Sequence, residues 1–339
     1  MSEKLSISEL NSELKVTPSR PSLLSGDFPG IEAWSKRRHL LDTDDLTVEE
    51  IDCIMSVAAA CKKLKEMSAA PLPVLEHKIV ANLFYENSTR TRSSFELAAR
   101  KLGATVLNLD IATSSVAKGE TIEDTAATLI AMGVNAVIQR HQSSGAAHRL
   151  SSTLGDQVHV INAGDGWHAH PTQALLDLFT MKETRQNLSG MKVAIVGDIL
   201  HSRVARSNIW LLLKAGMELH AVGPPTMIPA ELSKLGVTVH TDLEPAIANA
   251  DFIIVLRLQL ERQKQGLIPS IGEYKRLYRM DHKRLESAAP QVRVLHPGPA
   301  NRGIEITDEL IDDRKYSLVA DQVLNGIAIR MAVLYLLLG

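Results

Sequence analysis

A run of hydroxyl and guanidinium side chains follows a short apolar segment in the first third of the chain. The apolar segment, residues 79–84, has the pattern of a buried strand, and helical spacing begins near Phe95. Between them stand three hydroxyl residues and two arginines: Ser88, Thr89, Arg90, Thr91 and Arg92. A helix start presents free N–H groups and the positive end of the helix dipole, so two cations there predict a bound anion. This run predicts a site for a phosphate-like dianion, and an ordinary N-cap with surface arginines is the alternative.

Two further polar groups follow later strand-like segments. Arg140 comes directly after residues 136–139, so we expect it to point into the same region as the first run. His170 and Gln173 flank the start of a predicted helix, three residues apart, with Pro171 suited to its first turn. A neutral histidine donating a hydrogen bond to a carbonyl oxygen fits this position.

A metal site is the alternative for this second group. His168, His170 and Asp165 would be its ligands, but no metal-binding spacing such as HExxH and no cysteine pair supports it. A serine-histidine-aspartate elbow and a cysteine nucleophile are also missing from the sequence. The residues alone therefore give little support for a metal site and none for these nucleophilic mechanisms.

The second half of the chain offers groups suited to a carboxylate. Ser202 and Arg203 follow the strand-like residues 192–198, where a dinucleotide-binding protein would have G-x-G-x-x-G, which is absent. Arg257 and Gln259 follow residues 252–255 and alternate onto one side of an extended chain. Together Arg203 and Arg257 would clamp a dicarboxylate. These features predict direct transfer of a group between two bound small molecules.

Two loops complete the set of candidates. The loop His296-Pro297-Gly298-Pro299 is stiff, and the backbone carbonyls around Gly298 and Pro299 would accept hydrogen bonds from an amine. Ser114 and Lys118 lie in a polar loop before a predicted helix, and Lys118 is either a phosphate ligand or a solvated lysine.

The rest of the chain alternates strand-like and helical segments. Nine strands are expected, over residues 79–84, 105–109, 136–139, 158–162, 192–198, 218–222, 237–241, 252–255 and 293–295. This alternation predicts an α/β fold with two open parallel-sheet domains flanking an active-site cleft. We expect an N-terminal extension (1–35), a first domain (36–184) completed by a C-terminal helix (319–339), and a second domain (185–318). In open sheets ligands bind beyond the carboxyl ends of the strands, where the polar residues above lie.

Composition limits the class of protein. The formal net charge of −2 over 339 residues gives no sign of a nucleic-acid partner. The apolar C-terminal run is interrupted by Asp321 and Arg330, which favours a packed helix over a membrane span. Cys53 and Cys61 form no disulfide framework, so we expect a reducing compartment and a cytoplasmic location.

Taken jointly, these residues resemble the transcarbamoylases, and most closely the catalytic chains of aspartate carbamoyltransferases. The likeness runs from about Arg38 to the C-terminus. The run at 88–92 is similar to the carbamoyl-phosphate motif of the family. The other matching carbamoyl-phosphate residues are Arg140, His170 and Gln173, and the aspartate-binding positions are matched by Lys118, Arg203, Arg257 and Gln259. Ser114 and Lys118 match a loop that, in the family, enters the site of a neighbouring subunit.

The resemblance implies transfer of the carbamoyl group from carbamoyl phosphate to L-aspartate, an early step toward pyrimidines, without a cofactor. The implied phosphate ligands are Ser88, Thr89, Arg90 and Thr91, and the implied catalytic residues are Arg90, Thr91, Lys118, Arg140 and His170. The implied partners are identical chains in a homotrimer with shared sites, and regulatory or dihydroorotase chains in any larger assembly.

Two other interpretations stay open. Ornithine carbamoyltransferases carry a His-Cys-Leu-Pro loop, whereas this chain has His296-Pro297-Gly298-Pro299, which favours aspartate. Gly298 also departs from the leucine of some family members. A protein that kept the fold without turnover, as a binding or scaffolding protein, is the second alternative.

Overall fold

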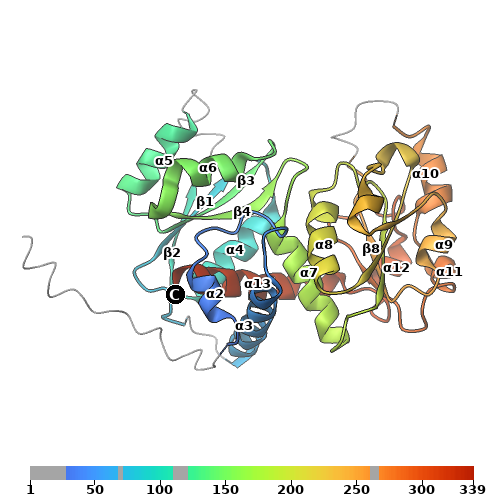
Figure 1. The fold of residues 1–339 in the computed structure, drawn as a ribbon, viewed down its shortest axis with the longest axis horizontal. Helices are drawn as coiled ribbons and strands as arrows, with labels where there is room; N and C mark the ends of the chain where they lie inside the picture. Colours follow the sequence, from blue (N-terminus) through green and yellow to red (C-terminus); the bar gives the residue numbers. More distant parts are fainter. Residues whose placement is uncertain (1–27, 68–71, 110–120, 260–266) are drawn as a thin grey trace, which may run out of the picture.

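Two parallel sheets dominate the structure, a computed structural model that describes residues 28–67, 72–109, 121–259 and 267–339 (Figure 1). The first sheet has four strands in the order β2-β1-β3-β4. Their bounds are β1 Ile79–Phe84, β2 Thr105–Leu109, β3 Ala136–His141 and β4 His159–Asp165. All neighbouring pairs are parallel, as the βαβ pattern predicts.

Helices cover both faces of the first sheet (Figure 1). One face packs Val80, Ile138 and Ile161 into a core shared with Phe95 of helix α4. The opposite face packs Ala81 and neighbouring residues against helices α5 and α6. The helices of this half are α2 Ile31–Ser35, α3 Val48–Met67, α4 Thr89–Lys101, α5 Ile122–Ala131 and α6 Ala146–Leu154, with a 3-10 turn at Gly155–Gln157.

The second sheet has five parallel strands in the order β7-β6-β5-β8-β9. They are β5 Lys192–Val196, β6 Glu218–Val222, β7 Thr238–His240, β8 Phe252–Val255 and β9 Arg293–Leu295. The helices around it are α8 Arg203–Lys214, α9 Leu243–Ile247, α10 Ile271–Tyr278, α11 His282–Leu285 and α12 Asp308–Asp312, with 3-10 turns at Pro225–Met227 and Leu232–Leu235. The central strands β5 and β8 are buried almost throughout, which explains their continuous apolar runs, whereas the edge strand β7 is largely exposed.

Two long helices join the halves. Helix α7 (Pro171–Thr184) contacts α8 of the second half and the C-terminal helix α13 (Val319–Leu338). Helix α13 returns to the first half, where it packs against α3 and α4 (Figure 1). By length and composition α13 alone, among the described helices, would suffice to cross a membrane, but most of its residues are buried inside the protein, as in a core helix.

Each sheet has a point where the strand order reverses. In the first sheet the chain moves from β1 to β2 on one side and then to β3 and β4 on the other. In the second sheet the same reversal separates β5 from β8. Loops that follow strands at such a point form the usual ligand site of an open sheet. The candidates lie near these points: Arg140 is within the last two residues of β3, residues 88–92 and Arg203 lie at the starts of the helices that follow β1 and β5, and Arg257 follows β8.

All nine expected strands are present, and the differences lie at element ends. Helix α8 begins at Arg203, four residues before the expected helix at 207–215, and residues 229–235 form only a short 3-10 turn. Helix α2 falls within the expected N-terminal extension, and Trp34 is fully buried there. The packed chain therefore begins before residue 36, because a single buried tryptophan supplies a large apolar contact area.

Candidate active site

The N-terminus of α4 holds the predicted anion site. Ser88 is the N-cap residue in an extended conformation, and its hydroxyl makes no capping hydrogen bond to the helix. Thr89 to Arg92 form the first turn, one turn earlier than expected, and this turn contains no acidic residue. Thr91 is buried, whereas the Arg90 side chain is exposed. Hydroxyl, N–H and guanidinium donors thus converge on one helix end without a carboxylate on that turn to balance them.

Arg90 faces residues of the second half. An added Cβ at Gly298 would lie 2.6 Å from Nη1 of Arg90, so the 296–299 loop is in contact with this guanidinium group. Loss of surrounding water lowers the pKa of Arg90, and the positive charge of Arg257 lowers it further. Arg90 and Arg257, from different halves of the protein, therefore lie near each other.

Glu86 joins two of the predicted arginines. Its Oε1 accepts hydrogen bonds from Nη2 of Arg140 at 2.6 Å and from Nη2 of Arg203 at 2.7 Å. Arg203 Nη1 donates to Oε2 of the same carboxylate at 3.1 Å. Arg140 ends β3 and Arg203 begins α8, so one carboxylate binds a guanidinium group from each half. Both arginines are buried, and the single negative charge of Glu86 offsets part of their combined positive charge.

Gly164 provides the space in which these arginines meet. Its φ of +115° disfavours other residues, and an added Cβ would lie 2.9 Å from Nε of Arg203 and 3.0 Å from Nη1 of Arg140. Arg140 Nη1 also donates to the carbonyl oxygen of Ala163 at 3.1 Å. A glycine at position 164 therefore permits the close approach of two arginine side chains.

His170 and Gln173 lie together at the start of α7, as expected. His170 is the N-cap residue, and its Nδ1 atom is buried without a hydrogen-bond partner in the described part of the chain. Burial, then the positive charges of Arg140 and Arg203, hold the pKa of His170 well below 6.5, so the ring is neutral. Gln173 donates through Nε2 to Asp177 at 2.9 Å.

The segment after β8 alternates as predicted. Leu256 and Leu258 are buried, whereas Arg257 and Gln259 are half-buried on the other side. The neighbouring 296–299 loop is held by buried bonds: His296 N–H donates to Oε1 of Gln322 at 3.0 Å. This loop of the second half therefore lies beside Arg90 of the first half.

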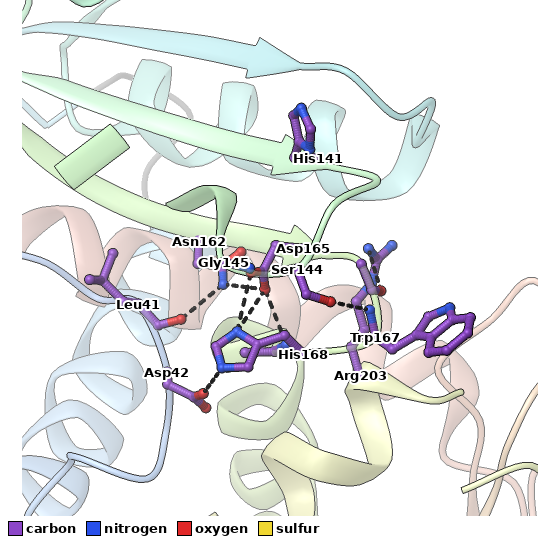
Figure 2. Close-up of polar contacts among 12 residues, drawn as sticks. Leu41, Asp42, His141, Ser144, Gly145, Asn162, Asp165, Trp167, His168 and Arg203 are labelled. Atoms are coloured by element: carbon purple, nitrogen blue, oxygen red, sulfur yellow. Dashed lines mark hydrogen bonds and ion pairs between the residues drawn. The ribbon is translucent and has the colours of Figure 1, made fainter. Parts of the chain in front are cut away.

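Two of the predicted residues, Ser114 and Lys118, lie outside the described residues, and a third lies elsewhere. His168 of the metal alternative instead lies between two carboxylates, with Nε2 3.1 Å from Asp42 and Nδ1 3.2 Å from Asp165 (Figure 2). In the described ranges no group of three or more histidine, cysteine or acidic residues is arranged to hold a metal.

Comparison with known proteins identifies the fold family. Residues 38–183 match the family model described as aspartate/ornithine carbamoyltransferase, carbamoyl-P binding domain. Residues 189–337 match its companion, the Asp/Orn binding domain. The chain belongs to the aspartate/ornithine carbamoyltransferase family. The resemblance of the chain to this family is therefore confirmed.

Curated relatives within the family are similar over most of their length. The aspartate carbamoyltransferase catalytic subunit of Thermosynechococcus vestitus is 51% identical over 312 residues, covering 89% of this chain and 94% of that protein. The catalytic subunit of Moorella thermoacetica is 52% identical over 304 residues, covering 90% and 98%.

Solved structures of both branches of the family share the fold. The aspartate transcarbamoylase of Trypanosoma cruzi, in complex with carbamoyl phosphate and aspartate, has a TM-score of 0.82 at 26% identity, covering 92% of this chain and 100% of that one. The ornithine carbamoyltransferase of Pyrococcus furiosus has a TM-score of 0.77 at 31% identity, covering 89% and 97%. Fold similarity alone thus does not separate the two carbamoyltransferase branches.

The sequence interpretation missed Glu86. It stands two residues before Ser88 in the same motif, directly after β1, and β1 pairs with β3 so that Phe84 lies beside Arg140. The sequence did contain a signal for this contact: an acidic residue follows one predicted strand, and an arginine stands at the end of another predicted strand. It went unused because the motif was interpreted as a purely cationic anion site.

Proposed function

We propose that this carbamoyltransferase transfers the carbamoyl group of carbamoyl phosphate to the amine of L-aspartate, giving N-carbamoyl-L-aspartate and phosphate. Relatives at 51–52% identity carry the name of this enzyme. The observation that carries the proposal is the proximity of Arg90 and Arg257, which belong to different halves, because two neighbouring cations suit a pair of anionic substrates. We infer that the product serves pyrimidine synthesis in the cytoplasm, where the buried free thiols of Cys53 and Cys61 remain reduced.

The phosphate half is assigned to the start of α4. Ser88, Thr89 and Thr91 would donate hydroxyl or backbone N–H hydrogen bonds to the phosphate, and Arg90 would neutralise its charge. The uncapped hydroxyl of Ser88 and the acid-free first turn support this assignment. The same groups stabilise phosphate as the leaving group, because its charge is balanced before the C–O bond breaks.

The carbonyl oxygen of the carbamoyl group is assigned to Arg140, His170 and Thr91. As the amine attacks, a C–N bond forms and negative charge moves onto this oxygen. The electron pair of the breaking C–O bond then goes to phosphate, which also takes the proton that the amine loses. A neutral His170 suits hydrogen-bond donation to the oxyanion, and the low pKa caused by its burial supports this role.

Aspartate is assigned to Arg203, Arg257 and Gln259. Arg203 is bound to Glu86 in the structure, so a substrate carboxylate would share or replace that contact. The half-buried Arg257 and Gln259 present neighbouring donors from an extended segment. The carbonyl groups of Gly298 and Pro299 are assigned to the carbamoyl amine, supported by the contact of this loop with Arg90.

We also propose a homotrimer in which Ser114 and Lys118 enter the site of the adjacent chain. The assignment rests on the family resemblance of that loop. Mixing Lys118→Ala chains with Arg90→Ala chains should restore part of the activity, because some interfaces then pair two intact halves. Verified re-assortment without recovery would contradict shared sites. We propose that the first domain comprises residues 36–184 and 319–339 together with helix α2 of the expected extension, supported by packing of α13 on α2, α3, α4 and α7.

A substrate comparison tests the function. The purified chain is supplied with carbamoyl phosphate and either aspartate or ornithine, and the ureido product is measured colorimetrically. We expect product with aspartate and none above background with ornithine. Product with ornithine alone would assign the chain to the other branch, and absence of product with either amine would support the non-catalytic alternative.

A further inference from the structure

A buried carboxylate lies one turn behind the candidate site. Asp177 of α7 is fully buried, four residues after Gln173. Its Oδ1 atom accepts hydrogen bonds from Nε2 of Gln173 at 2.9 Å and from Nε2 of Gln322 at 2.7 Å. Its Oδ2 atom accepts from Nδ2 of Asn208 at 2.9 Å. Asp177 thus accepts hydrogen bonds from three side-chain amides, one on each of α7, α8 and α13.

An ionised carboxylate only accepts hydrogen bonds, so it fixes which end of each amide faces it. Gln173 must direct its NH2 group at Asp177, and its carbonyl oxygen Oε1 then becomes the end available to a ligand at the start of α7. Within the described residues, Oε1 of Gln173 receives no hydrogen bond from the protein. In this orientation the carbonyl oxygen of Gln173 can accept a hydrogen bond from the NH2 group of a carbamoyl substrate. In the reverse orientation the NH2 group of Gln173 would face the NH2 group of the substrate, and two donors cannot form a hydrogen bond.

Asp177 also orients the side-chain amide of Gln322, which contacts the 296–299 loop. Because Nε2 of Gln322 is bound to Asp177, its Oε1 atom is the end that accepts the N–H of His296, at 3.0 Å. His296 Nδ1 in turn accepts the N–H of Gly298 at 2.8 Å. A continuous chain of hydrogen bonds therefore runs from Asp177 to the loop that touches Arg90.

We propose that Asp177 is a positioning residue that makes the enzyme select the NH2 group of its carbamoyl donor. It holds the oxygen of Gln173 toward that group and, through Gln322, holds the carbonyl-bearing loop on the other side. The inference rests on the proposed function, since it concerns the same donor substrate. Asp177 itself touches no reacting atom in this scheme.

The charge state of Asp177 supports the role. Burial raises its pKa to about 6, although hydrogen bonds from Asn208, Gln322 and Gln173 act in the opposite direction. The charged group that acts on it in the described chain is Arg330 of α13, while α8 supplies the neutral Asn208. Above neutral pH the carboxylate is therefore ionised and acts only as an acceptor.

Asp177→Asn tests the proposal because it keeps the shape and removes the constraint on amide direction. Acetyl phosphate is the probe, since a methyl group replaces the NH2 of carbamoyl phosphate. We expect kcat/KM for carbamoyl phosphate to fall by about 30-fold, because a donor–donor contact replaces a hydrogen bond. The inhibition constant of acetyl phosphate against carbamoyl phosphate should change by less than about threefold, since its methyl group makes no such bond.

Thr180→Val is the matched control. Thr180 is buried one turn further along α7, and its Oγ1 accepts from Asn325 of α13 at 3.0 Å, so this change damages the same helix interface. It should lower the melting temperature and leave the selectivity between the two acyl phosphates intact. Parallel loss of affinity for both phosphates in Asp177→Asn, or no loss for either, would overturn the proposal.

If Asp177→Asn does not fold, the pH dependence of ligand preference in the wild-type chain tests the proposal instead. Acidification from pH 8 to pH 5 protonates Asp177 near pH 6. The preference for carbamoyl phosphate over acetyl phosphate should then fall, while titration of the two phosphate groups affects both ligands alike. A preference that stays constant over this range would overturn the inference. Wild-type turnover of aspartate, measured first, separates this outcome from failure of the proposed function.

Discussion

Arg90, in helix α4 of the first half, lies near Arg257, which follows β8 in the second half. Loss of surrounding water lowers the pKa of Arg90, and the positive charge of Arg257 lowers it further. No acidic group is among the charges that act on Arg90 in the described part of the chain. Like charges held near one another raise the free energy of the unliganded protein, and a bound anion turns that repulsion into attraction. The arrangement of these two arginines is therefore more stable when an anionic ligand is bound.

Replacing Arg90 with alanine tests this directly. We expect kcat/KM to fall by 10²–10³-fold, roughly 3–4 kcal/mol, because a charge-assisted contact to phosphate is lost. Inorganic phosphate should raise the melting temperature of the wild-type chain by linkage and have little effect on Arg90→Ala. Arg100→Ala is the control, since Arg100 lies in the last turn of α4 and pairs with Glu96. Near-normal turnover by Arg90→Ala would contradict the assignment.

Glu86→Gln removes the charge shared by Arg140 and Arg203 and keeps the side-chain size. Two buried guanidinium groups then lose their counter-charge, so we expect a loss of about 2 kcal/mol in the free energy of unfolding. The KM for aspartate should rise, because Arg203 is no longer held toward the first half. Thermal unfolding and aspartate saturation curves measure the two effects.

A dicarboxylate offers a second readout for Glu86. Succinate cannot react, but its carboxylates can replace the missing charge, so it should stabilise Glu86→Gln more than wild type. Glu96→Gln, at an exposed ion pair of α4, is the control. Equal stabilisation of all three proteins would show that Glu86 does not hold the arginines together.

The sheets were predictable because buried parallel strands have continuous apolar runs separated by helical segments. The four candidates Ser88, Arg140, Arg203 and Arg257 were predictable because they follow strands at the reversal points of the sheets. Helix ends were less accurate, since Arg203 could belong to either a loop or a first turn until packing decided it.

Contacts between residues far apart in the chain could not be predicted from the sequence. Asp177 and Gln322 are 145 positions apart, and nothing local indicates that one amide will meet one carboxylate. Glu86 had a local signal, but its partner Arg203 is 117 positions away. Such pairs depend on how α7, α8 and α13 pack, and helix packing is set by many side chains together.

Gly298→Ala tests the close approach of the 296–299 loop to Arg90. The new Cβ would lie 2.6 Å from Nη1 of Arg90 and displace either the loop or the guanidinium group. We expect kcat/KM for carbamoyl phosphate to fall at least tenfold, about 1.4 kcal/mol or more. Gly303→Ala is the matched control, because Gly303 also has a positive φ, of +74°, but nothing lies within 4 Å of its added Cβ. Both variants pay about 1–2 kcal/mol of backbone strain, so equal losses of activity would exclude the collision as the cause.

His168→Gln tests the ring held between Asp42 and Asp165 (Figure 2). Hydrogen bonds from the ring to Asp165 and Asp42 raise the pKa of His168 to about 10. A pKa raised by folding contributes stability that is fully present below pH 6.5 and is lost as the pH rises through 10. Wild type should therefore exceed His168→Gln by about 1 kcal/mol at pH 6, a modest value because the ring is a third exposed, and the difference should vanish above pH 10. Melting curves of both proteins from pH 6 to pH 10.5 measure this, and a difference that does not depend on pH would mean that His168 acts through packing instead of charge.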